Sequence, residues 1–157
     1  TMDNTKRPSK QTEAFRNACI NAVKMLAQED ASLLVVGNKD TPMFPEELLK
    51  FTKRTTFGKG GIKVNFLVNY GWQWDLKKLS NNNIERNKIL NFINSNDISR
   101  VDLIIRWGQR RRLSGFLPVQ SIYADFYVVD EFWPDFRPEH LYEALEWYGQ
   151  QDITYGG

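Results

Sequence analysis

The chain has 157 residues, a length that allows one domain with a sizeable core. Its hydrophobic content of 41% is globular, and 21 basic against 19 acidic side chains leave a net charge of +2, which gives no argument for binding nucleic acid. A single cysteine excludes an intramolecular disulfide framework, and no apolar run reaches the ~20 residues that span a bilayer. We therefore expect a cytoplasmic protein with at most peripheral contact to a membrane.

Two helices and two strands are predicted in the first half of the chain. The clearest helix runs from Gln11 to Gln28, and a short one from Pro45 to about Arg54 has proline in its first turn. Ser32 to Gly37 and Ile62 to Tyr70 are predicted strands. The long helix is predicted from one apolar stripe at helical spacing, formed by Phe15, Ala18, Cys19, Ala22, Val23 and Leu26.

The second half begins with a weakly predicted helix from Ile84 to Ile93. Val101 to Ile105 is predicted to be a strand covered on both faces, and Ser114-Gly115 is predicted to open an amphipathic helix from Phe116 onward. The alternation of helices and strands predicts an α/β fold in which helices flank a largely parallel central sheet. We expect residues 1–157 to form a single domain.

Arginines crowd the end of the strand predicted over Val101–Ile105. Arg106, Arg110, Arg111 and Arg112 fall within seven positions, and we call residues 108–115 the arginine loop. Ligands of open α/β sheets bind at the carboxyl ends of strands, a helix N-terminus adds N–H donors, and guanidinium forks match phosphate oxygens. The pattern therefore indicates a phosphate or diphosphate site. A solvated basic loop is the alternative.

Short sequence motifs are distributed along the whole chain. They are Thr1-Met2-Asp3-Asn4 with Arg7-Pro8, Asn69-Tyr70-Gly71 with Trp74-Asp75, Val101-Asp102-Leu103 with Arg106, Arg112-Leu113-Ser114 with Phe116-Leu117, then Gln120, Tyr123, Asp125 and Tyr127, Trp133-Pro134-Asp135-Phe136, and Tyr155-Gly156-Gly157. In these motifs and in their order, the chain resembles the cis-prenyltransferase (undecaprenyl diphosphate synthase) family.

The resemblance implies the cis-prenyltransferase fold and a transferase reaction of isoprenoid biosynthesis. In that reaction, isopentenyl diphosphate condenses with an allylic prenyl diphosphate to form a polyprenyl diphosphate, and Mg²⁺ stabilises the departing diphosphate. Asp125 stands where the family has a metal-binding glutamate. The substrate-binding residues implied by the resemblance are Arg106, Arg112 and Ser114, which would clamp isopentenyl diphosphate, together with Asn69 and Arg110.

Several positions depart from the family pattern. Arg110 replaces a glutamate, which raises the affinity for anions but removes a candidate acid or base, and Trp107 replaces a threonine. The family's M-D-G-N-x-R-W-A motif, whose aspartate holds magnesium and the allylic diphosphate, has no match in this sequence. The chain thus looks like the C-terminal two-thirds of a synthase without its N-terminal strand and D-G-N motif. We expect this chain alone to be inactive.

Aromatic side chains are dense near the C-terminus, which favours a core or a subunit interface. They are Phe126, Tyr127, Phe132, Trp133, Phe136, Tyr142, Trp147 and Tyr148. Because the family dimerises through this region, the resemblance implies a homodimer or a heterodimer. His140, at the start of a predicted helix, has no cysteine or histidine partner, so a metal-binding role is disfavoured.

Three classes of function are compatible with the sequence. The first is a prenyltransferase, and the second is a non-catalytic subunit of a two-chain prenyltransferase, which Arg110 and the missing aspartate motif favour. The third is an anion-binding module for nucleotides or RNA. Nucleic acid is not expected as a partner, because the basic charge is confined to one loop.

Overall fold

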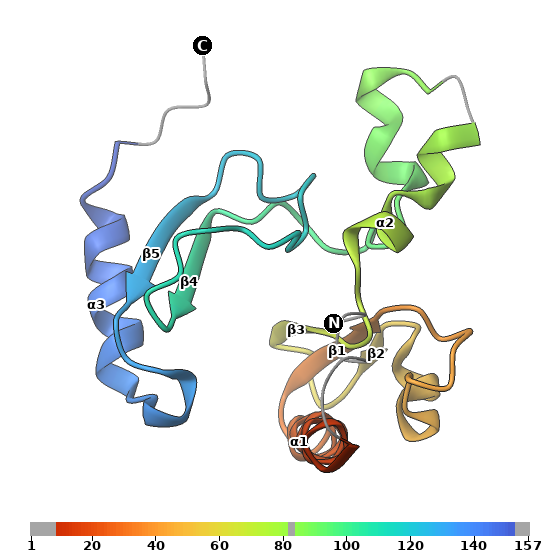
Figure 1. Ribbon diagram of the computed structural model, residues 1–157, viewed down its shortest axis with the longest axis horizontal. Helices are drawn as coiled ribbons and strands as arrows, with labels where there is room; N and C mark the ends of the chain where they lie inside the picture. The colour runs from red at the N-terminus through yellow and green to blue at the C-terminus, as the bar shows by residue number, and fades with distance from the viewer. Residues whose placement is uncertain (1–8, 82–83, 153–157) are drawn as a thin grey trace. The chain divides into compact units, whose positions relative to one another are not determined.

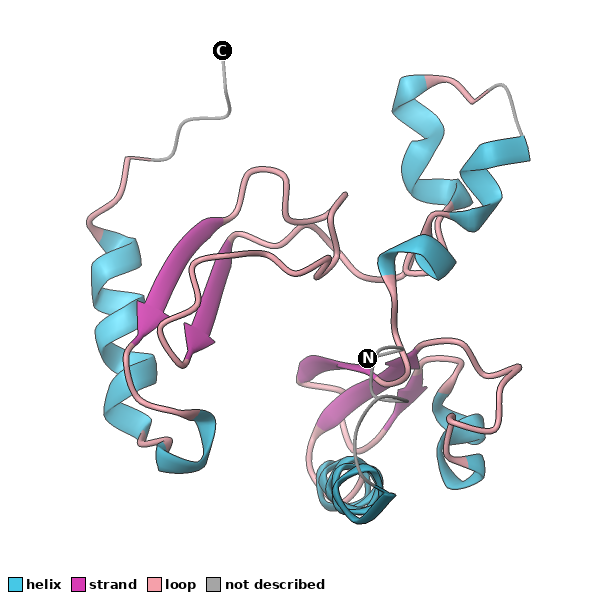
Figure 2. Cartoon of the chain, in the orientation of Figure 1, coloured by secondary structure: helices cyan, strands magenta, loops and turns pink. Residues whose placement is uncertain are grey.

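The computed structural model describes residues 9–81 and 84–152, and Figure 1 shows their path. These residues pack as two compact units, one within Thr1–Asn96 and the other within Asp97–Gly157, which we call the N-terminal and C-terminal units. Each unit combines helices with parallel strands (Figure 2). The predicted mixed α/β class is therefore confirmed, whereas a single domain over residues 1–157 stays a prediction.

The N-terminal unit is built on a three-stranded sheet of order β2-β1-β3. Its elements are the helix α1 (Ser9–Leu26), the strand β1 (Ala31–Val36), the 3₁₀ helix η2 (Glu46–Phe51), and the strands β2 (Thr55–Thr56) and β3 (Ile62–Leu67). Strand β1 pairs in parallel with β3 and antiparallel with β2. The helix predicted over Gln11–Gln28 and the two predicted strands are confirmed within a few residues.

The core of this unit lies where α1 and η2 meet β1. All six residues of β1 are buried, as expected for a strand with apolar side chains on both faces. Val23 of α1 and Leu48 of η2 are fully buried in the same cluster as Leu33 and Val35. Cys19 packs against that cluster, and desolvation raises the pKa of its thiol. Its predicted place in the apolar stripe is thus confirmed.

Three short helices follow, α2 (Trp72–Asp75), η3 (Lys77–Asn81) and η4 (Arg86–Phe92). Asp75, the last residue of α2, has a fully buried side chain. Its carboxylate accepts hydrogen bonds from the Tyr70 hydroxyl, the Ser95 N–H and the Ser95 hydroxyl, each at 2.7 Å. One carboxylate therefore joins the end of α2 to Ser95, which lies 20 positions later in the chain.

The C-terminal unit consists of two parallel strands and a helix. They are β4 (Leu103–Trp107), β5 (Asp125–Val129) and α3 (Pro138–Gly149), with the 3₁₀ turn η5 (Trp133–Asp135) before α3. The rings of Tyr127 and Trp147 lie 5.4 Å apart, so α3 covers the face of the sheet to which Tyr127 belongs. Strand β4 also includes Arg106 and Trp107, beyond its predicted end.

The amphipathic helix predicted from Phe116 onward is wrong, because residues 116–123 form bends and turns. The backbone is left-handed at Ser114 (φ 52°), Gly115 (φ 72°) and Leu117 (φ 39°), which interrupts any helical run. Pro118 adds to this effect, since the residue before a proline is disfavoured in the α conformation. The arginine loop therefore has no helix N-terminus beside it.

The helices described within residues 9–81 and 84–152 include none with the length and apolar character required to cross a bilayer.

Candidate substrate-binding site

Arg106, Arg112 and Ser114, the three residues predicted to clamp a diphosphate, lie together in the C-terminal unit. The Arg106 guanidinium projects from β4 and donates a hydrogen bond to the backbone carbonyl oxygen of Arg112. The same Nη1 atom lies 3.2 Å from the Ser114 hydroxyl oxygen. Arg106 thus connects the C-terminal part of the arginine loop, at Arg112 and Ser114, to strand β4, which precedes the loop.

The near side of the loop is fixed by backbone hydrogen bonds at Gly108. Its N–H donates to the carbonyl oxygens of Val129 (3.1 Å) and Glu131 (2.7 Å). Val129 is the last residue of β5, and Glu131 lies two positions after it. Gly108 has φ 83°, a left-handed conformation in which a side chain would be strained. The loop is therefore fastened at its base as well as by Arg106.

Three guanidinium groups of the loop remain open to solvent. Arg110, Arg111 and Arg112 are exposed, and within the described residues none of the three is in an ion pair. Like charges this close in sequence repel each other unless anions gather around them. The loop therefore combines a fixed backbone with unpaired positive charge. Phosphate oxygens would form charge-assisted hydrogen bonds with such guanidinium groups.

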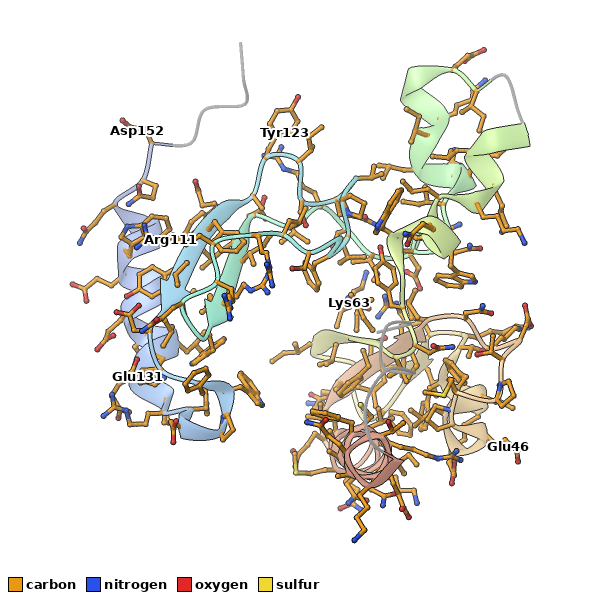
Figure 3. All side chains as sticks on the ribbon, viewed as in Figure 1. Glu46, Lys63, Arg111, Tyr123, Glu131 and Asp152 are labelled. Atoms are coloured by element: carbon orange, nitrogen blue, oxygen red, sulfur yellow. The ribbon has the colours of Figure 1, made fainter. Side chains whose placement is uncertain are left out.

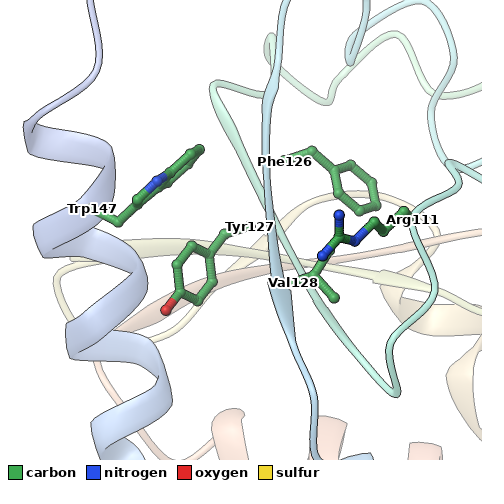
Figure 4. Close-up of a pocket in the computed structure, with 5 residues that line it drawn as sticks. All are labelled: Arg111, Phe126, Tyr127, Val128 and Trp147. Carbon is green, nitrogen blue, oxygen red and sulfur yellow. The ribbon is translucent and has the colours of Figure 1, made fainter.

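A pocket of about 610 Å³ lies beside this loop, lined by Arg111, Phe126, Tyr127, Val128 and Trp147. Figure 4 shows Tyr127 and Trp147 on one side of β5, with Phe126, Val128 and the Arg111 guanidinium on the other. Arg111 is its one charged lining residue, and none of the predicted site residues lines it. The sequence showed Arg111 only as a member of the arginine run, and no motif pointed to the pocket.

Asp125, the predicted metal ligand, is the first residue of β5. It pairs in register with Leu103, whereas Arg106 pairs with Val128, so Asp125 and Arg106 are three register positions apart, roughly 10 Å along the strands. The neighbouring carboxylate of Asp102 is 3.6 Å from the Arg100 guanidinium. Among the described residues, no three His, Cys, Asp or Glu side chains gather where a metal ion could bind. These residues do not fit a magnesium ion by themselves.

Asn69, the fifth predicted substrate-binding residue, belongs to the N-terminal unit and follows β3 with φ 52°. Its amide nitrogen donates to the Asn38 carbonyl oxygen at 2.7 Å and to the Thr41 hydroxyl at 2.8 Å. The Asn38 N–H in turn donates to the Asn69 carbonyl oxygen at 3.1 Å. The buried Asn69 side chain therefore holds the loop that follows β1.

The fold as a whole matches a solved structure. A chain described as a probable undecaprenyl diphosphate synthase of Campylobacter jejuni superposes with a TM-score of 0.74 at 18% sequence identity, over 99% of this chain and 79% of that chain. The chain thus shares the mixed α/β fold with parallel strands of that structure. At this identity the match establishes the fold alone.

Sequence comparison identifies the family. Residues 1–156 match the family model described as "Putative undecaprenyl diphosphate synthase". The chain is 30% identical over 176 residues to a ditrans,polycis-undecaprenyl-diphosphate synthase of Vibrio vulnificus, described as specific for (2E,6E)-farnesyl diphosphate, covering 99% of this chain and 69% of the relative. A synthase of the same description from Photorhabdus laumondii is 31% identical over 177 residues, with 100% and 69% coverage. The chain belongs to the undecaprenyl diphosphate synthase (cis-prenyltransferase) family.

Proposed function

We propose that this chain takes part in cis-prenyl transfer, in which isopentenyl diphosphate condenses with an allylic prenyl diphosphate to form a polyprenyl diphosphate. Family membership supports the reaction class, and the relatives' description as farnesyl-diphosphate specific supports the substrate class. The observation that carries the proposal is the arginine loop, which is fastened by Arg106 and exposes unpaired guanidinium groups. A cytoplasmic protein in peripheral contact with a membrane is part of the proposal, because the product is a lipid.

Within this proposal, the loop residues and Arg106 make different contacts with the diphosphate. Arg112 and Arg110 contribute charge-assisted hydrogen bonds to phosphate oxygens, and the Ser114 hydroxyl donates a further one. Arg106 contributes both charge and the correct position of Ser114, to which it is hydrogen bonded. Asn69 orders the loop after β1 within the N-terminal unit, and its role in binding substrate stays a prediction.

The proposal includes Mg²⁺, for which the described residues of the site offer a single carboxylate, that of Asp125. When bound, the ion would neutralise charge on the departing diphosphate. Asp125 alone offers one carboxylate, and Mg²⁺ is usually held by one or two carboxylates together with substrate phosphates. We therefore propose Asp125 as a magnesium ligand only together with substrate oxygens or ligands beyond the described residues.

A substitution at Arg112 tests the diphosphate site. Arg112→Ala removes a charge-assisted hydrogen bond worth about 1.5–3 kcal/mol, so we expect the Kd for isopentenyl diphosphate to rise by about tenfold to a hundredfold. Isothermal titration measures this change. Arg100→Ala is the matched control, since Arg100 precedes β4 at the end away from the loop and the substitution removes the same charge. Equal affinity of Arg112→Ala and the control would contradict the site.

A second candidate function is a non-catalytic subunit of a two-chain cis-prenyltransferase. The favouring observation is that the described residues contain no cluster of carboxylates that could hold a metal ion. Arg110, where the family has glutamate, also favours it, because a positive charge replaces a candidate acid or base. In both functions the arginine loop binds a diphosphate, so catalysis distinguishes them.

The C-terminal unit exposes large apolar side chains, which supports association into a homodimer or a heterodimer. Their exposed fractions are 69% for Phe132, 63% for Trp133, 66% for Tyr142 and 50% for Leu145. Exposed aromatic and aliphatic groups in such number mark an interaction surface. They lie on or just before α3, the region through which the family resemblance implies dimerisation.

We expect light scattering at micromolar concentration to give the mass of a dimer. Leu145→Glu places a charge on the apolar face and should shift the mass toward the monomer, whereas Glu146→Gln, the neighbouring exposed position, should leave it unchanged. A monomeric mass for the unmodified chain, in the absence of a partner chain, would exclude the homodimer and leave the heterodimer.

A further inference from the structure

His140 is the one histidine of the chain and is almost completely buried in the first turn of α3, with 2% of its surface exposed. Its Nδ1 atom is 3.2 Å from the Trp107 indole nitrogen and 3.3 Å from the Arg137 backbone nitrogen. Both of these nitrogens carry hydrogen and can only donate. The imidazole therefore joins the N-terminus of α3 to the last residue of β4.

The hydrogen bonds determine the role of Nδ1. It faces the Trp107 indole N–H and the Arg137 backbone N–H, which can only donate, so Nδ1 is an acceptor. Nε2 faces the Arg137 guanidinium, with Nε at 3.3 Å and Nη2 at 3.1 Å, and lies 3.7 Å from the Glu131 carboxylate. That carboxylate also accepts a hydrogen bond from the Arg137 Nη2 atom at 3.2 Å. His140 is thus an acceptor toward Trp107.

Trp107 is held on its other sides by aromatic rings. Its ring centroid is 4.9 Å from that of Trp133 in an edge-to-face arrangement, and 5.7 Å from that of Phe136. Edge-to-face packing fixes the plane of the indole, and the hydrogen bond to His140 fixes its rotation within that plane. Trp107 therefore has a defined orientation at the position that immediately precedes the arginine loop.

Glu131, labelled in Figure 3, closes a ring of contacts around the first residues of the loop. Its backbone carbonyl oxygen accepts the Gly108 N–H at 2.7 Å, while its carboxylate faces Arg137 and His140. Trp107 is thus hydrogen bonded to His140 directly. Gly108 is connected to His140 indirectly, through Glu131. A change at His140 would be transmitted to the base of the loop.

We propose that His140 is a positioning residue, which through its hydrogen bond to Trp107 holds the base of the arginine loop in the geometry that binds a diphosphate. That the loop binds a diphosphate rests on the proposed function. That His140 controls the geometry of the loop does not. His140 touches no arginine of the loop in the described contacts, so it acts through Trp107 and the Glu131 segment.

Hydrogen exchange of the backbone amides of Gly108 and Gln109, which donate to the Val129 and Glu131 carbonyl oxygens, tests the proposal, together with titration of inorganic pyrophosphate. Trp107→Phe keeps an aromatic ring but removes the indole N–H, and His140→Leu removes the acceptor. Each should speed exchange in the loop by about fivefold and weaken pyrophosphate binding by a similar factor, as expected for the loss of one hydrogen bond. His140→Asn, whose amide oxygen can take the place of Nδ1, should restore values close to those of the unmodified chain.

Two controls separate positioning from general stability. Gln151→Ala removes a hydrogen bond to the Trp147 carbonyl oxygen at the opposite end of α3 from His140, and it should leave loop exchange unchanged. Trp107→Phe also leaves the bond from the Arg137 N–H to His140 in place, so a residue that merely capped α3 would give no effect in this variant.

The double variant Trp107→Phe/His140→Leu should exchange no faster than the faster single variant, because both remove the same hydrogen bond. Unchanged loop exchange in Trp107→Phe, or fully additive effects in the double variant, would overturn the proposal even if His140→Leu failed to fold. Should the unmodified chain bind neither pyrophosphate nor isopentenyl diphosphate, the proposed function fails, and the exchange rates still decide the positioning role.

Discussion

Purified alone and incubated with an allylic diphosphate, isopentenyl diphosphate and Mg²⁺, the 157-residue chain is expected to form no polyprenyl product. Ionisation of an allylic diphosphate builds negative charge on the leaving group, and that charge must be neutralised. The sequence contains no D-G-N motif, and among the described residues no three potential metal ligands gather at one place. Asp125 alone, three register positions from Arg106, does not replace them.

Radiolabelled isopentenyl diphosphate provides the measurement, with product extracted into organic solvent. We expect incorporation to appear when a chain or segment that carries the family's M-D-G-N motif is added. Arg112→Ala should reduce the restored activity, whereas Arg100→Ala should not. Primer-dependent long-chain product from the 157-residue chain by itself would show that the missing motif is dispensable and would contradict this prediction.

Replacing Asp75 by alanine is expected to give a large loss of stability in the N-terminal unit. The change leaves the Tyr70 hydroxyl and both Ser95 donors without their acceptor in a fully buried place. Hydrogen bonds to a charged group contribute about 1.5–3 kcal/mol each, and the costs of neighbouring losses do not simply add. We therefore expect the free energy of unfolding to fall by about 3–5 kcal/mol.

Urea unfolding followed by tryptophan fluorescence measures this loss, since Trp72 and Trp74 lie in the same short helix as Asp75. Asp40→Ala is the matched control, because Asp40 is an exposed carboxylate of the same unit. Tyr70→Phe removes a single donor and should lower the free energy of unfolding by about 1 kcal/mol. A midpoint for Asp75→Ala equal to that of Asp40→Ala would show that the buried hydrogen bonds do not stabilise the unit.

Regular periodicity explains which elements could be predicted from the sequence. The apolar stripe around Cys19 and Val23 is set by local spacing, and the buried run Ser32 to Val36 is recognisable because it is apolar on both faces. Both were correctly predicted. The helix from Phe116 onward failed because the apolar spacing there competes with left-handed backbone at Ser114 and Leu117, and that backbone depends on contacts of the folded loop.

The candidate site was predictable in part for a similar reason. Arg106, Arg112 and Ser114 are close in sequence, so a motif could bring them together, and the structure places them in one hydrogen-bonded group. The bond between Trp107 and His140 spans 33 positions, and nothing in the local pattern of either residue indicates the other. Contacts of this kind follow from how α3 packs on the sheet, which the sequence pattern does not specify.

The hydrogen bonds from Arg106 across the arginine loop also affect the thermodynamics of ligand binding. Because the loop is closed by this side chain and by the Gly108 N–H before any anion arrives, its conformational entropy is lost during folding. An arriving diphosphate then has little ordering of the protein to oppose it, and more of the charge attraction appears as affinity. The loop is, in this sense, a preorganised receptor whose rigidity is part of the stability of the C-terminal unit.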